Sequence, residues 1–458
     1  MKAILKSTVG LFVFLCVSCH PSNEGWTKLF NGKDLTGFRQ LNGKAPFRIE
    51  NGELVGVSTK NEPSSFLATE QEYGDFILEF DVLCDPALNS GVQFRSLSRA
   101  DFNNGRVHGY QCEIDPSDRA WSGGIYDEGR RGWLVTLTDH PTGQAAYRKT
   151  DWNHYRVEAI GDTLRIWLNG VNTANLLDNT TPKGFIALQI HSIGNNDAMD
   201  GKEIRWKDIR IRTENLEANR MQGILAPEVN RIPNTLSEQE GAEGWTLLFD
   251  GKTPNGWRGA SRDAFPDRGW KIEDGRLTVL KASGEERGGD IVTERRYGAF
   301  ELSIEFQLTK GANSGIKYFT VESERGFVYG LEYQVLDDAE HPDAKQATSF
   351  PGSRTLASLY DLIPAERKRT NSIGDWNLAG IKVFTDNHVE HWLNGFKVLE
   401  YERGSEAFRE RVKGSKFADR SYNGDGPFGE APEGYILLQD HGDEVSFRSI
   451  KIKALKPI

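Results

Sequence analysis

The sequence has few cysteines, no surplus of basic residues and no long apolar run. Its 458 residues carry a formal net charge of -10, which argues against a nucleic-acid or anionic-membrane surface, because such surfaces are built from clustered Lys and Arg. Beyond the N-terminal segment the only cysteines are Cys84 and Cys112, and the sequence alone cannot place them within bridging distance. GxSxG, GxxxxGK[ST] and HExxH motifs are absent, so serine-hydrolase, phosphate-loop and zinc-protease chemistry find no support.

The first residues are typical of an export signal and are excluded from the fold. Residues 1–6 carry two lysines, and the apolar run at 7–18 is too short to span a bilayer as a stable helix. Val17-Ser18-Cys19 resembles a bacterial lipobox. The resemblance implies removal of residues 1–18 and lipidation of Cys19, which would anchor an exported protein to a bacterial membrane, in the periplasm or at the cell surface. Ordinary secretion with an unmodified Cys19 is the alternative.

The chain repeats a set of motifs in one order. WTKLFNGKDLTGF at Trp26 recurs as WTLLFDGKTPNGW at Trp245, NSGVQFR at 89–95 recurs as NSGIKYF at 313–319, and GFIALQIH at 184–191 recurs as GYILLQDH at 434–441. Ordered matches over such a long period indicate two copies of one domain, predicted at 26–212 and 245–453. Residues 213–244 are polar, contain prolines, and are predicted to form a linker with room for a short helix.

Apolar side chains recur with a period of two in both copies. FILEFDVL at 76–83 alternates apolar and polar residues, and ELSIEFQL at 301–308 repeats the pattern. No stretch sustains the spacing of three and four that an amphipathic helix requires. Short strands separated by Gly-rich turns predict an all-β fold, with each copy a β-sandwich or jelly roll that can expose one polar, concave sheet face.

An acid and an amide share one strand face in each copy. Alternation places Gln111, Glu113 and Asp115 on one face of the strand at 109–115, and Glu332 and Gln334 on one face of the strand at 330–336. The two copies therefore keep one acid and one amide but exchange their order. Simple solvation is the alternative explanation, because any half-buried antiparallel strand shows polar alternation.

Further polar residues stand at matching places in the two copies, except that the cations Arg95 and Lys317 stand at neighbouring positions. In the first copy they are Arg95, Asp127, Gln189 and His191; in the second they are Lys317, Tyr360, Asp361, Gln439 and His441. Carboxylates and amides bond sugar hydroxyls, and aromatic faces stack on sugar rings. Together with many tryptophans, this inventory favours a saccharide site and predicts an oligosaccharide or glycoside as the ligand.

The acidic loop at 337–343 raises the alternative of a divalent metal. Asp337, Asp338, His341 and Asp343 offer oxygen and imidazole ligands, although their spacing fits no calcium loop. An Asp-rich turn whose side chains bond their own backbone is the other interpretation. The sequence requires no cofactor and leaves this metal as a hypothesis.

Several motifs together resemble the family of 3-keto-disaccharide hydrolase domains. They are NSG, EYQVLDDAEHPDA, LYD, HWLNG and LQDHG, and the resemblance covers both copies. The second copy is the closer match, because the first lacks the HPDA loop and has IWLNG. The resemblance implies two tandem concanavalin A-like jelly rolls and a glycosidase-like hydrolase acting on glycosides oxidised at the sugar C3.

A ketone at C3 makes such a glycoside cleavable by proton transfer. It acidifies the hydrogen on C2, so a general base can remove that hydrogen and the group on C1 can leave, after which water adds. A cation or metal beside the ketone oxygen would hold the enolate charge. The hypothesis assigns Glu332 or His441 as base, Lys317 as enolate stabiliser, Asp361 or Tyr360 as acid, and Gln334 and Gln439 as hydroxyl ligands. The first-copy counterparts are Glu113, His191, Arg95, Asp127, Gln111 and Gln189, with Asp115 as a further binding residue.

Two other functions stay open at this point. A retaining glucanase on the same fold would carry Glu-x-Asp-x-x-Glu, but here the segment from Glu113 to Asp118 ends in the wrong acid and has no equivalent in the second copy. A non-catalytic sugar-binding lipoprotein would use its two copies for avidity. Activity on an unoxidised glucan would favour the first alternative, and glycan binding without product would favour the second.

Overall fold

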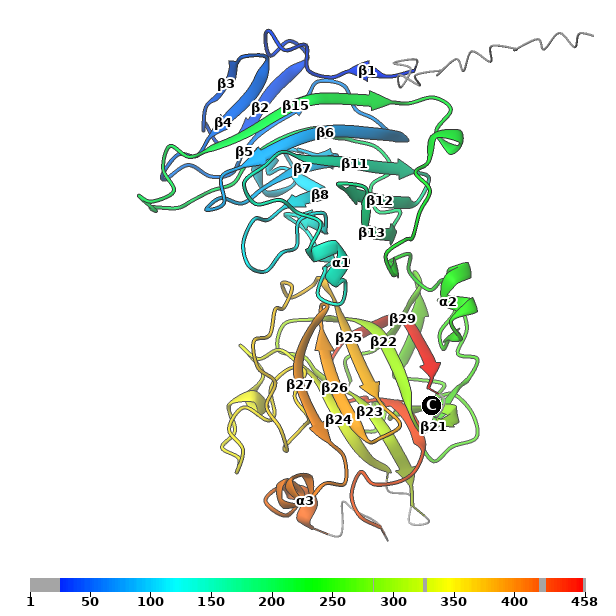
Figure 1. Ribbon diagram of the computed structural model, residues 1–458. Coiled ribbons are helices and arrows are strands. Elements are labelled where there is room, and N and C mark those ends of the chain that lie inside the picture. Colours follow the sequence, from blue (N-terminus) through cyan, green and yellow to red (C-terminus); the bar gives the residue numbers. More distant parts are fainter. Residues whose placement is uncertain (1–24, 283, 324–327, 420–425, 456–458) are drawn as a thin grey trace, which may run out of the picture.

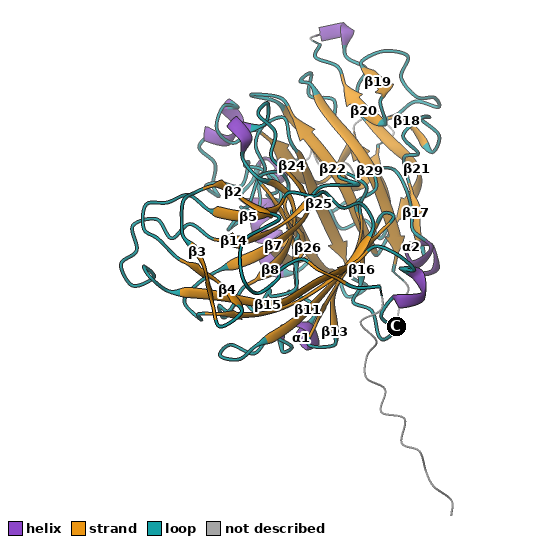
Figure 2. Ribbon diagram, turned by 90° about the horizontal axis from the view of Figure 1, so that it is seen from above, coloured by secondary structure: helices purple, strands orange, loops and turns teal. Residues whose placement is uncertain are grey.

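The computed structural model describes residues 25–282, 284–323, 328–419 and 426–455. Cys19 and the rest of the predicted export signal lie outside these residues. Figure 1 shows two β-sandwiches, one above the other, joined by a green segment that carries α2 (Glu238–Ala242). Figure 2 shows strands making up nearly all of both halves, with only short helices between them. No helix in the described part of the chain is long and apolar enough to cross a membrane.

The first sandwich consists of two mainly antiparallel sheets. In spatial order the larger contains β16 (Glu228–Asn230), β13 (Val171–Leu177), β12 (Thr163–Leu168), β11 (Asn153–Ile160), β6 (Phe76–Cys84), β15 (Glu203–Arg212), β4 (Glu53–Val57) and β3 (Phe47–Glu50), with β1 (Thr27–Lys28) also paired to β15. The smaller contains β10 (Gly132–Val135), β9 (Ile125–Glu128), β8 (His108–Ile114), β7 (Ser90–Leu97), β14 (Phe185–Ile190), β5 (Ser65–Thr69) and β2 (Phe38–Asn42).

The second sandwich repeats this arrangement with fewer strands. Its larger sheet contains β19 (Trp270–Glu273), β20 (Arg276–Val279), β29 (Val445–Ala454), β22 (Phe300–Leu308), β25 (Trp376–Val383), β26 (His388–Leu393) and β27 (Phe396–Glu402), with β17 (Trp245–Leu247) paired to β29. Its smaller sheet contains β18 (Trp257–Gly259), β21 (Ile291–Tyr297), β28 (Gly434–Leu438), β23 (Asn313–Glu322) and β24 (Val328–Leu336).

Each sandwich has its own apolar core. Phe76, Leu78 and Phe80 on β6 are fully buried in the first, and Phe300 and Ile304 on β22 are fully buried in the second. The alternation seen in the sequence therefore places one side of each long strand between the sheets. The described structure is all-β, with two jelly-roll-like sandwiches in tandem.

The helices are short and lie in connections. The α-helices beside α2 are α1 (Pro141–Gln144) and α3 (Glu406–Lys413), and the described 3-10 turns are η1 (Asn103–Gly105), η2 (Glu217–Asn219), η3 (Gly284–Glu286), η4 (Pro342–Lys345) and η5 (Lys416–Ala418). Helix α3 begins at Ser405, whose hydroxyl accepts the Phe408 N–H at 3.1 Å. Phe408 is buried against Tyr401, and the chain then continues directly into η5.

The segment between the sandwiches contacts both of them. Strand β16 pairs in parallel with β13 of the first sandwich. Glu240 on α2 accepts hydrogen bonds from Lys451 of the second sandwich at 2.8 and 3.1 Å. Trp121 of the first sandwich also lies 5.6 Å, between ring centroids, from Phe396 of the second. Residues 213–244 are thus packed structure, with the predicted short helix at α2.

Both described cysteines are buried and free. Cys84 lies on β6 and Cys112 on β8. Burial raises the pKa of each thiol above its ordinary value, so both remain protonated and unreactive at neutral pH.

Candidate active site

A pocket of about 230 Å³ lies on the smaller sheet of the second sandwich. Its polar lining residues come from β23, β24, the end of β28 and two loops, and they are Asn313, Lys317, Glu332, Gln334, Asp343, Tyr360, Lys416, Gln439 and His441. Every residue predicted as catalytic or substrate-binding in the second copy lies here, except Asp361. Strand alternation therefore gathers Lys317, Glu332 and Gln334 on one sheet face, and loops add the rest of the lining.

A glycine in the NSG motif makes room for the acid. Lys317 lies opposite Glu332 in the β23–β24 ladder, and Gly315 lies opposite Gln334. Side chains at opposed positions of an antiparallel pair point to the same face. A Cβ atom on Gly315 would lie 2.4 Å from Glu332 Oε1. The missing side chain therefore lets the Glu332 carboxylate lie over β23.

Three charged groups meet at the base of this pocket. Lys317 Nζ lies 3.9 Å from Glu332 Oε2 and 3.9 Å from Asp290 Oδ2. Glu332 is 8% exposed, and its burial raises the pKa of its carboxyl above the ordinary value although Lys317 opposes the shift. Burial also raises the pKa of Asp290. A carboxylate with a raised pKa is a stronger base, so Glu332 is suited to proton abstraction.

Tyr360 and Lys416 also line the pocket. The Tyr360 hydroxyl donates to Asp343 Oδ2 at 2.9 Å, and Lys416 Nζ lies 4.2 Å from the centroid of the Tyr360 ring. Burial raises the pKa of Tyr360, so the phenol keeps its proton and can act as a donor. Burial lowers the pKa of Lys416, and Glu332 opposes that shift. Sequence patterns missed Lys416 because it comes from the loop connection after α3.

Asp361 does not line the pocket, which corrects its prediction as the acid. Its carboxylate accepts Arg354 Nε and the Lys416 backbone N–H, both at 2.8 Å, and it is 3% exposed. Tyr360 and Asp361 lie in a turn, and Asp361 has a φ of 61°, in the left-handed region. Asp361 therefore holds the Lys416 segment in place, and Tyr360 is the member of the LYD motif that reaches the pocket.

The predicted metal set does not come together either. Asp337 accepts the Gly311 and Ala339 backbone N–H groups, and Asp338 pairs with Lys368. The bond from Ala339 is the local turn bond that the turn interpretation expects, the bond from Gly311 comes from the loop before β23, and Asp338 is already paired with a lysine.

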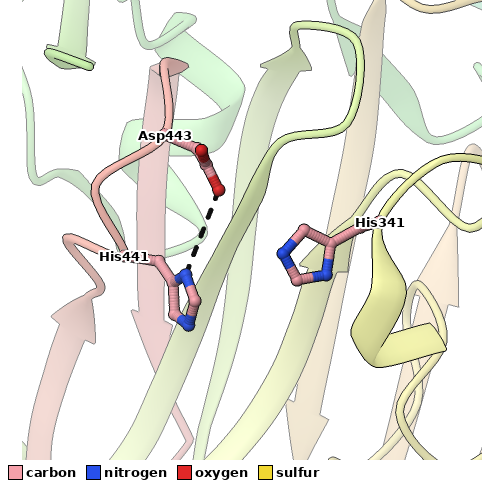
Figure 3. Close-up of side chains that lie close together, drawn as sticks. All are labelled: His341, His441 and Asp443. Atoms are coloured by element: carbon pink, nitrogen blue, oxygen red, sulfur yellow. Dashed lines mark ion pairs between the residues drawn. The ribbon is translucent and has the colours of Figure 1, made fainter. Parts of the chain in front are cut away.

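The other two members of that set have different partners. Asp343 pairs with Arg354 at 3.0 Å and with Tyr360. His341 caps η4 by accepting the Asp343 N–H at 3.2 Å, and its ring lies 5.9 Å from the ring of His441. Figure 3 shows His341 beside His441 and Asp443, two residues that follow β28. The prediction of one ligand set on loop 337–343 was therefore wrong.

The first sandwich has a wider pocket of about 680 Å³ on the equivalent sheet. Predicted residues that line it are Gln111, Glu113, Asp115 and His191, and Asn89, Arg119, Tyr126, Trp133 and Arg369 also contribute. Arg369 belongs to the second sandwich, so this pocket is completed across the domain boundary. Sequence patterns could not reveal that contribution.

Glu113 lies within a continuous hydrogen-bond network. It accepts Asn89 Nδ2 at 2.7 Å and Gln111 Nε2 at 2.9 Å, while Gln111 Oε1 accepts Gln93 Nε2 at 2.5 Å. Burial raises the pKa of Glu113 to about 7, and the two amide donors oppose the shift. The nearest cation is Arg119, which lies 3.9 Å from Glu113 and pairs with Asp115 at 2.7 Å.

Arg95 lies in the protein interior, which corrects its prediction as the first-copy cation. Its guanidinium donates to the Gly74 and Gly161 carbonyls and to Asp75, and it is 1% exposed. The ladder between β7 and β8 shifts register after Phe94, and Arg95 has a φ of 44°. This bulge interrupts the alternation, so the side chain leaves the polar face.

Asp127 and Gln189 do not line the first pocket. Asp127 is fully buried and pairs with Arg130 and Arg131, so it has a structural role in place of the predicted acid role. Gln189 is also fully buried, and its amide has no hydrogen-bond partner among the described residues. Gln111 covers the neighbouring Gly91, where an added Cβ would lie 2.4 Å from its Cδ. Four of the residues predicted for the first copy line its pocket, namely Gln111, Glu113, Asp115 and His191.

The fold and these pockets define a class of protein, the carbohydrate-active β-sandwiches. Acids, amides and a cation converge on one sheet face of each copy, as saccharide recognition requires. The chain belongs to the 3-keto-alpha-glucoside-1,2-lyase-like domain family, whose model matches residues 25–212 and 244–453. Membership in this family makes the protein a carbohydrate hydrolase.

Parts of the chain are similar to individual proteins. A protein from Bacteroides thetaiotaomicron, named 3-keto-disaccharide hydrolase, is 39% identical over 236 residues, which are 47% of this chain and 79% of the relative. A solved structure from Parabacteroides distasonis, described as a candidate glycosyl hydrolase, is 32% identical and aligns with 49% of this chain and 100% of its own, with a TM-score of 0.43. A second such structure from the same organism is 26% identical over 46% of this chain and 99% of its own, with a TM-score of 0.34.

Proposed function

We propose that the second sandwich cleaves glycosides that carry a ketone at the sugar C3. Support comes from the family match and from the relative named 3-keto-disaccharide hydrolase. The observation that carries the proposal is the buried Glu332, with a raised pKa, 3.9 Å from Lys317 in a pocket with Gln334 and Gln439. A volume of about 230 Å³ suits one sugar unit better than a long chain.

The proposed reaction begins with removal of the C2 proton. The Glu332 carboxylate takes this proton, and the C–H electrons pass toward the ketone oxygen to form an enolate. Lys317 stabilises the enolate charge. The enolate then reforms the ketone as a C1–C2 double bond forms and the C1–O bond breaks, and the leaving oxygen takes a proton from Tyr360.

Water completes the net hydrolysis. Its oxygen bonds to C1, and C2 regains a proton from the protonated Glu332, which restores the carboxylate. The proton lost by Tyr360 returns from the attacking water. Neither an oxidant nor a reductant is consumed, so the 3-keto sugar and the free alcohol are the only products. Gln334 and Gln439 hold sugar hydroxyls during these steps.

We propose a second function for the first sandwich, namely saccharide binding without rapid cleavage. Glu113 is saturated by two amide donors, and the position opposite Gln111 carries Gln93, where the second copy has a lysine. The nearby cation, Arg119, is paired with Asp115 at 2.7 Å, so it is less available to stabilise an enolate than Lys317 in the second copy. Trp133 and Arg119, whose guanidinium lies 4.9 Å from that ring, provide a stacking surface at the pocket.

The test is to incubate the full chain with 3-keto-trehalose or a 3-keto-glucoside and to follow the release of free sugar by mass spectrometry. We expect release from the keto substrate and none from unoxidised trehalose. Release that continues unchanged in Glu332→Gln would overturn the assignment of the base. Binding of the keto substrate in calorimetry without any product would overturn the proposed cleavage and favour a binding protein.

We also propose that the protein is exported and held to a bacterial membrane through Cys19. Support comes from the lipobox-like sequence Val17-Ser18-Cys19. In a bacterial host, we expect the protein in the membrane fraction and a lipid-modified N-terminal peptide in mass spectrometry. Cys19→Ala should move the protein to the soluble fraction, and an unchanged distribution with no lipid mass would refute the anchor.

A further inference from the structure

We propose that the cavity between the two sandwiches is a binding site for a sugar acid, that is, a hydroxylated monosaccharide that carries one carboxylate. The cavity measures about 420 Å³ and lies where the segment that carries α2 joins the two sandwiches (Figure 1). Its lining comes from β10 of the first sandwich, from β16 and α2 of the connecting segment, and from β22, β25 and β26 of the second sandwich. Cavities of this size at domain interfaces are common binding sites for small molecules.

Arg231 brings an uncompensated positive charge to this cavity. It follows β16 directly and lines the cavity, and its Nε atom is buried without a hydrogen-bond partner among the described residues. Burial lowers the pKa of Arg231, and the charges of Glu305 and Asp178 oppose the shift without a hydrogen bond. A guanidinium removed from water normally has an anion as its direct partner, because an unpaired buried charge is costly. Arg231 therefore points to an anionic group on a ligand.

Two acids of the second sandwich that line the cavity already have basic partners. Glu305 on β22 accepts Arg448 Nε at 2.8 Å. Glu301, on the same strand, lies 3.3 Å from Lys453 Nζ. These pairs compensate the two carboxylates within the second sandwich, so neither acid serves as the direct counter-ion of Arg231.

Glu228 supplies a hydrogen-bond acceptor that has no donor. It lies on β16 and lines the same cavity, and its Oε1 atom is buried without a hydrogen-bond partner among the described residues. Buried polar atoms normally have a partner. A carboxylate accepts hydrogen bonds from sugar hydroxyls. Glu228 and Arg231 together therefore favour one ligand that carries both hydroxyl donors and an anionic group.

The rest of the lining selects the charge and shape of that ligand. Trp133, Leu134 and Leu378 offer apolar contacts to the carbon face of a sugar ring. Carboxyl groups outnumber Lys and Arg side chains around the cavity: the acids are Asp139, Glu228, Glu240, Glu243, Glu301 and Glu305, and the bases are Arg231, Lys382 and Lys451. This excess of negative charge disfavours a doubly charged phosphate and leaves a singly charged carboxylate as the better anion.

The cavity is distinct from the proposed catalytic pocket. It shares no lining residue with the pocket of the second sandwich, and it shares Trp133 with the pocket of the first. Binding of a sugar acid here therefore does not depend on the proposed cleavage reaction.

The test measures binding of glucuronate to the full chain by calorimetry, with glucose and inorganic phosphate as comparison ligands. We expect one glucuronate per chain, and at least about tenfold weaker binding of glucose and of phosphate, because each lacks one of the two groups that the cavity recognises. Arg231→Gln should bind glucuronate at least about tenfold more weakly than wild type. Arg220→Gln, in the same connecting segment but outside the cavity, is the matched control and should bind as wild type.

Thermal unfolding distinguishes a ligand site from a structural role of Arg231. Without ligand, Arg231→Gln should melt no lower than wild type, because the substitution removes a charge that has no direct partner. Excess glucuronate should raise the unfolding temperature of the wild type and leave that of Arg231→Gln nearly unchanged. A lower unfolding temperature of the ligand-free variant, with equal glucuronate affinity, would show a structural role and overturn the site.

The location of the bound acid is tested with Lys317→Gln, which removes a cation of the second pocket. This variant should bind glucuronate as wild type. Loss of binding in Lys317→Gln with retained binding in Arg231→Gln would place the acid in the second pocket and overturn the proposal, as would phosphate that binds as tightly as glucuronate. If glucuronate binds as expected but the 3-keto-glucoside is not cleaved, this site stands and the cleavage proposal fails; cleavage without glucuronate binding would give the reverse.

Discussion

The two sandwiches place an acid and an amide on the same strands but in opposite order. In the second, Gly315 of the NSG motif lies opposite Gln334, whereas in the first the matching Gly91 lies opposite Glu113. The acid of the first copy is therefore two residues further along its strand. The glycine is covered by the other residue of each acid–amide pair: Glu332 covers Gly315 in the second copy, and Gln111 covers Gly91 in the first.

The partner of that covering side chain also differs. Lys317 lies opposite Glu332 in the second copy, and Gln93 lies opposite Gln111 in the first. The second pocket thus holds an acid and a cation that are 3.9 Å apart, without the direct contact of a tight salt bridge. In the first pocket, the amide and carboxylate groups bond directly to one another, and the cation at the same distance from the acid, Arg119, is paired with Asp115 at 2.7 Å. The two pockets therefore differ by an exchange of neighbouring side chains on one scaffold.

The largest effect should come from removing the acid in each copy. Glu332→Gln removes the proposed base, so turnover of a 3-keto-glucoside should fall by about 10²- to 10⁴-fold. Glu113→Gln is the matched control and should change turnover by less than about tenfold. Steady-state rates measured on the full chain decide between them. Equal losses in the two variants would show that both pockets take part in turnover.

Exchange of the cation should follow in size. Lys317→Gln installs the side chain that the first copy has at Gln93, and kcat should fall by about 10²- to 10³-fold because the enolate loses its stabilising charge. KM should change little, since the ketone in the ground state is uncharged. Lys310→Gln, on an exposed loop, is the control. A rise in KM at constant kcat would show that Lys317 only binds substrate.

A pH dependence of stability should distinguish the first sandwich. The pKa of Glu113 is about 7 in the fold and has an ordinary value of 4.5, so the folded state keeps a proton that the unfolded chain releases between these values. This stabilisation is fully present below pH 4.5 and is lost as the pH rises through 7, by about 3 kcal/mol in total. Glu113→Gln should remove this pH dependence of the free energy of unfolding, measured by thermal unfolding of the first sandwich. An unchanged pH dependence would contradict the raised pKa of Glu113.

The smallest effect should come from the glycine that admits the acid. Gly315→Ala places a Cβ against the Glu332 carboxylate, so turnover should fall by about tenfold or more while the unfolding temperature stays close to wild type. The stability should survive because only the end of a flexible side chain has to move. Gly91→Ala meets Gln111 in the same way and should leave turnover nearly unchanged. A loss of folding in Gly315→Ala would show that the glycine serves the backbone instead.

The sequence predicted well those site residues that obey strand alternation. Lys317, Glu332, Gln334 and Gln439 lie on regular parts of β23, β24 and the end of β28, so a period of two was sufficient to place them together. Arg95 fails the same rule because it lies within a bulge and itself has a positive φ. Bulges leave no reliable mark in a single sequence.

Residues from loops and from the other sandwich could not be predicted in this way. Lys416 reaches the pocket from the turn after α3, and Arg369 reaches the first pocket from the second sandwich. Their positions depend on packing between distant segments, which has no local period. Asn313 did leave a signal, since NSG occurs in both copies.

Strand β16 has a consequence for how the two halves can be separated. Without it, β13 would end its sheet with unpaired N–H and C=O groups, which invite edge-to-edge aggregation. A fragment that stops at Arg212 would expose this border, although every residue of the first repeat would be present. Truncation after Asn230 keeps the edge of β13 paired with β16. The connecting segment therefore protects the edge strand of the first sandwich as well as linking it to the second.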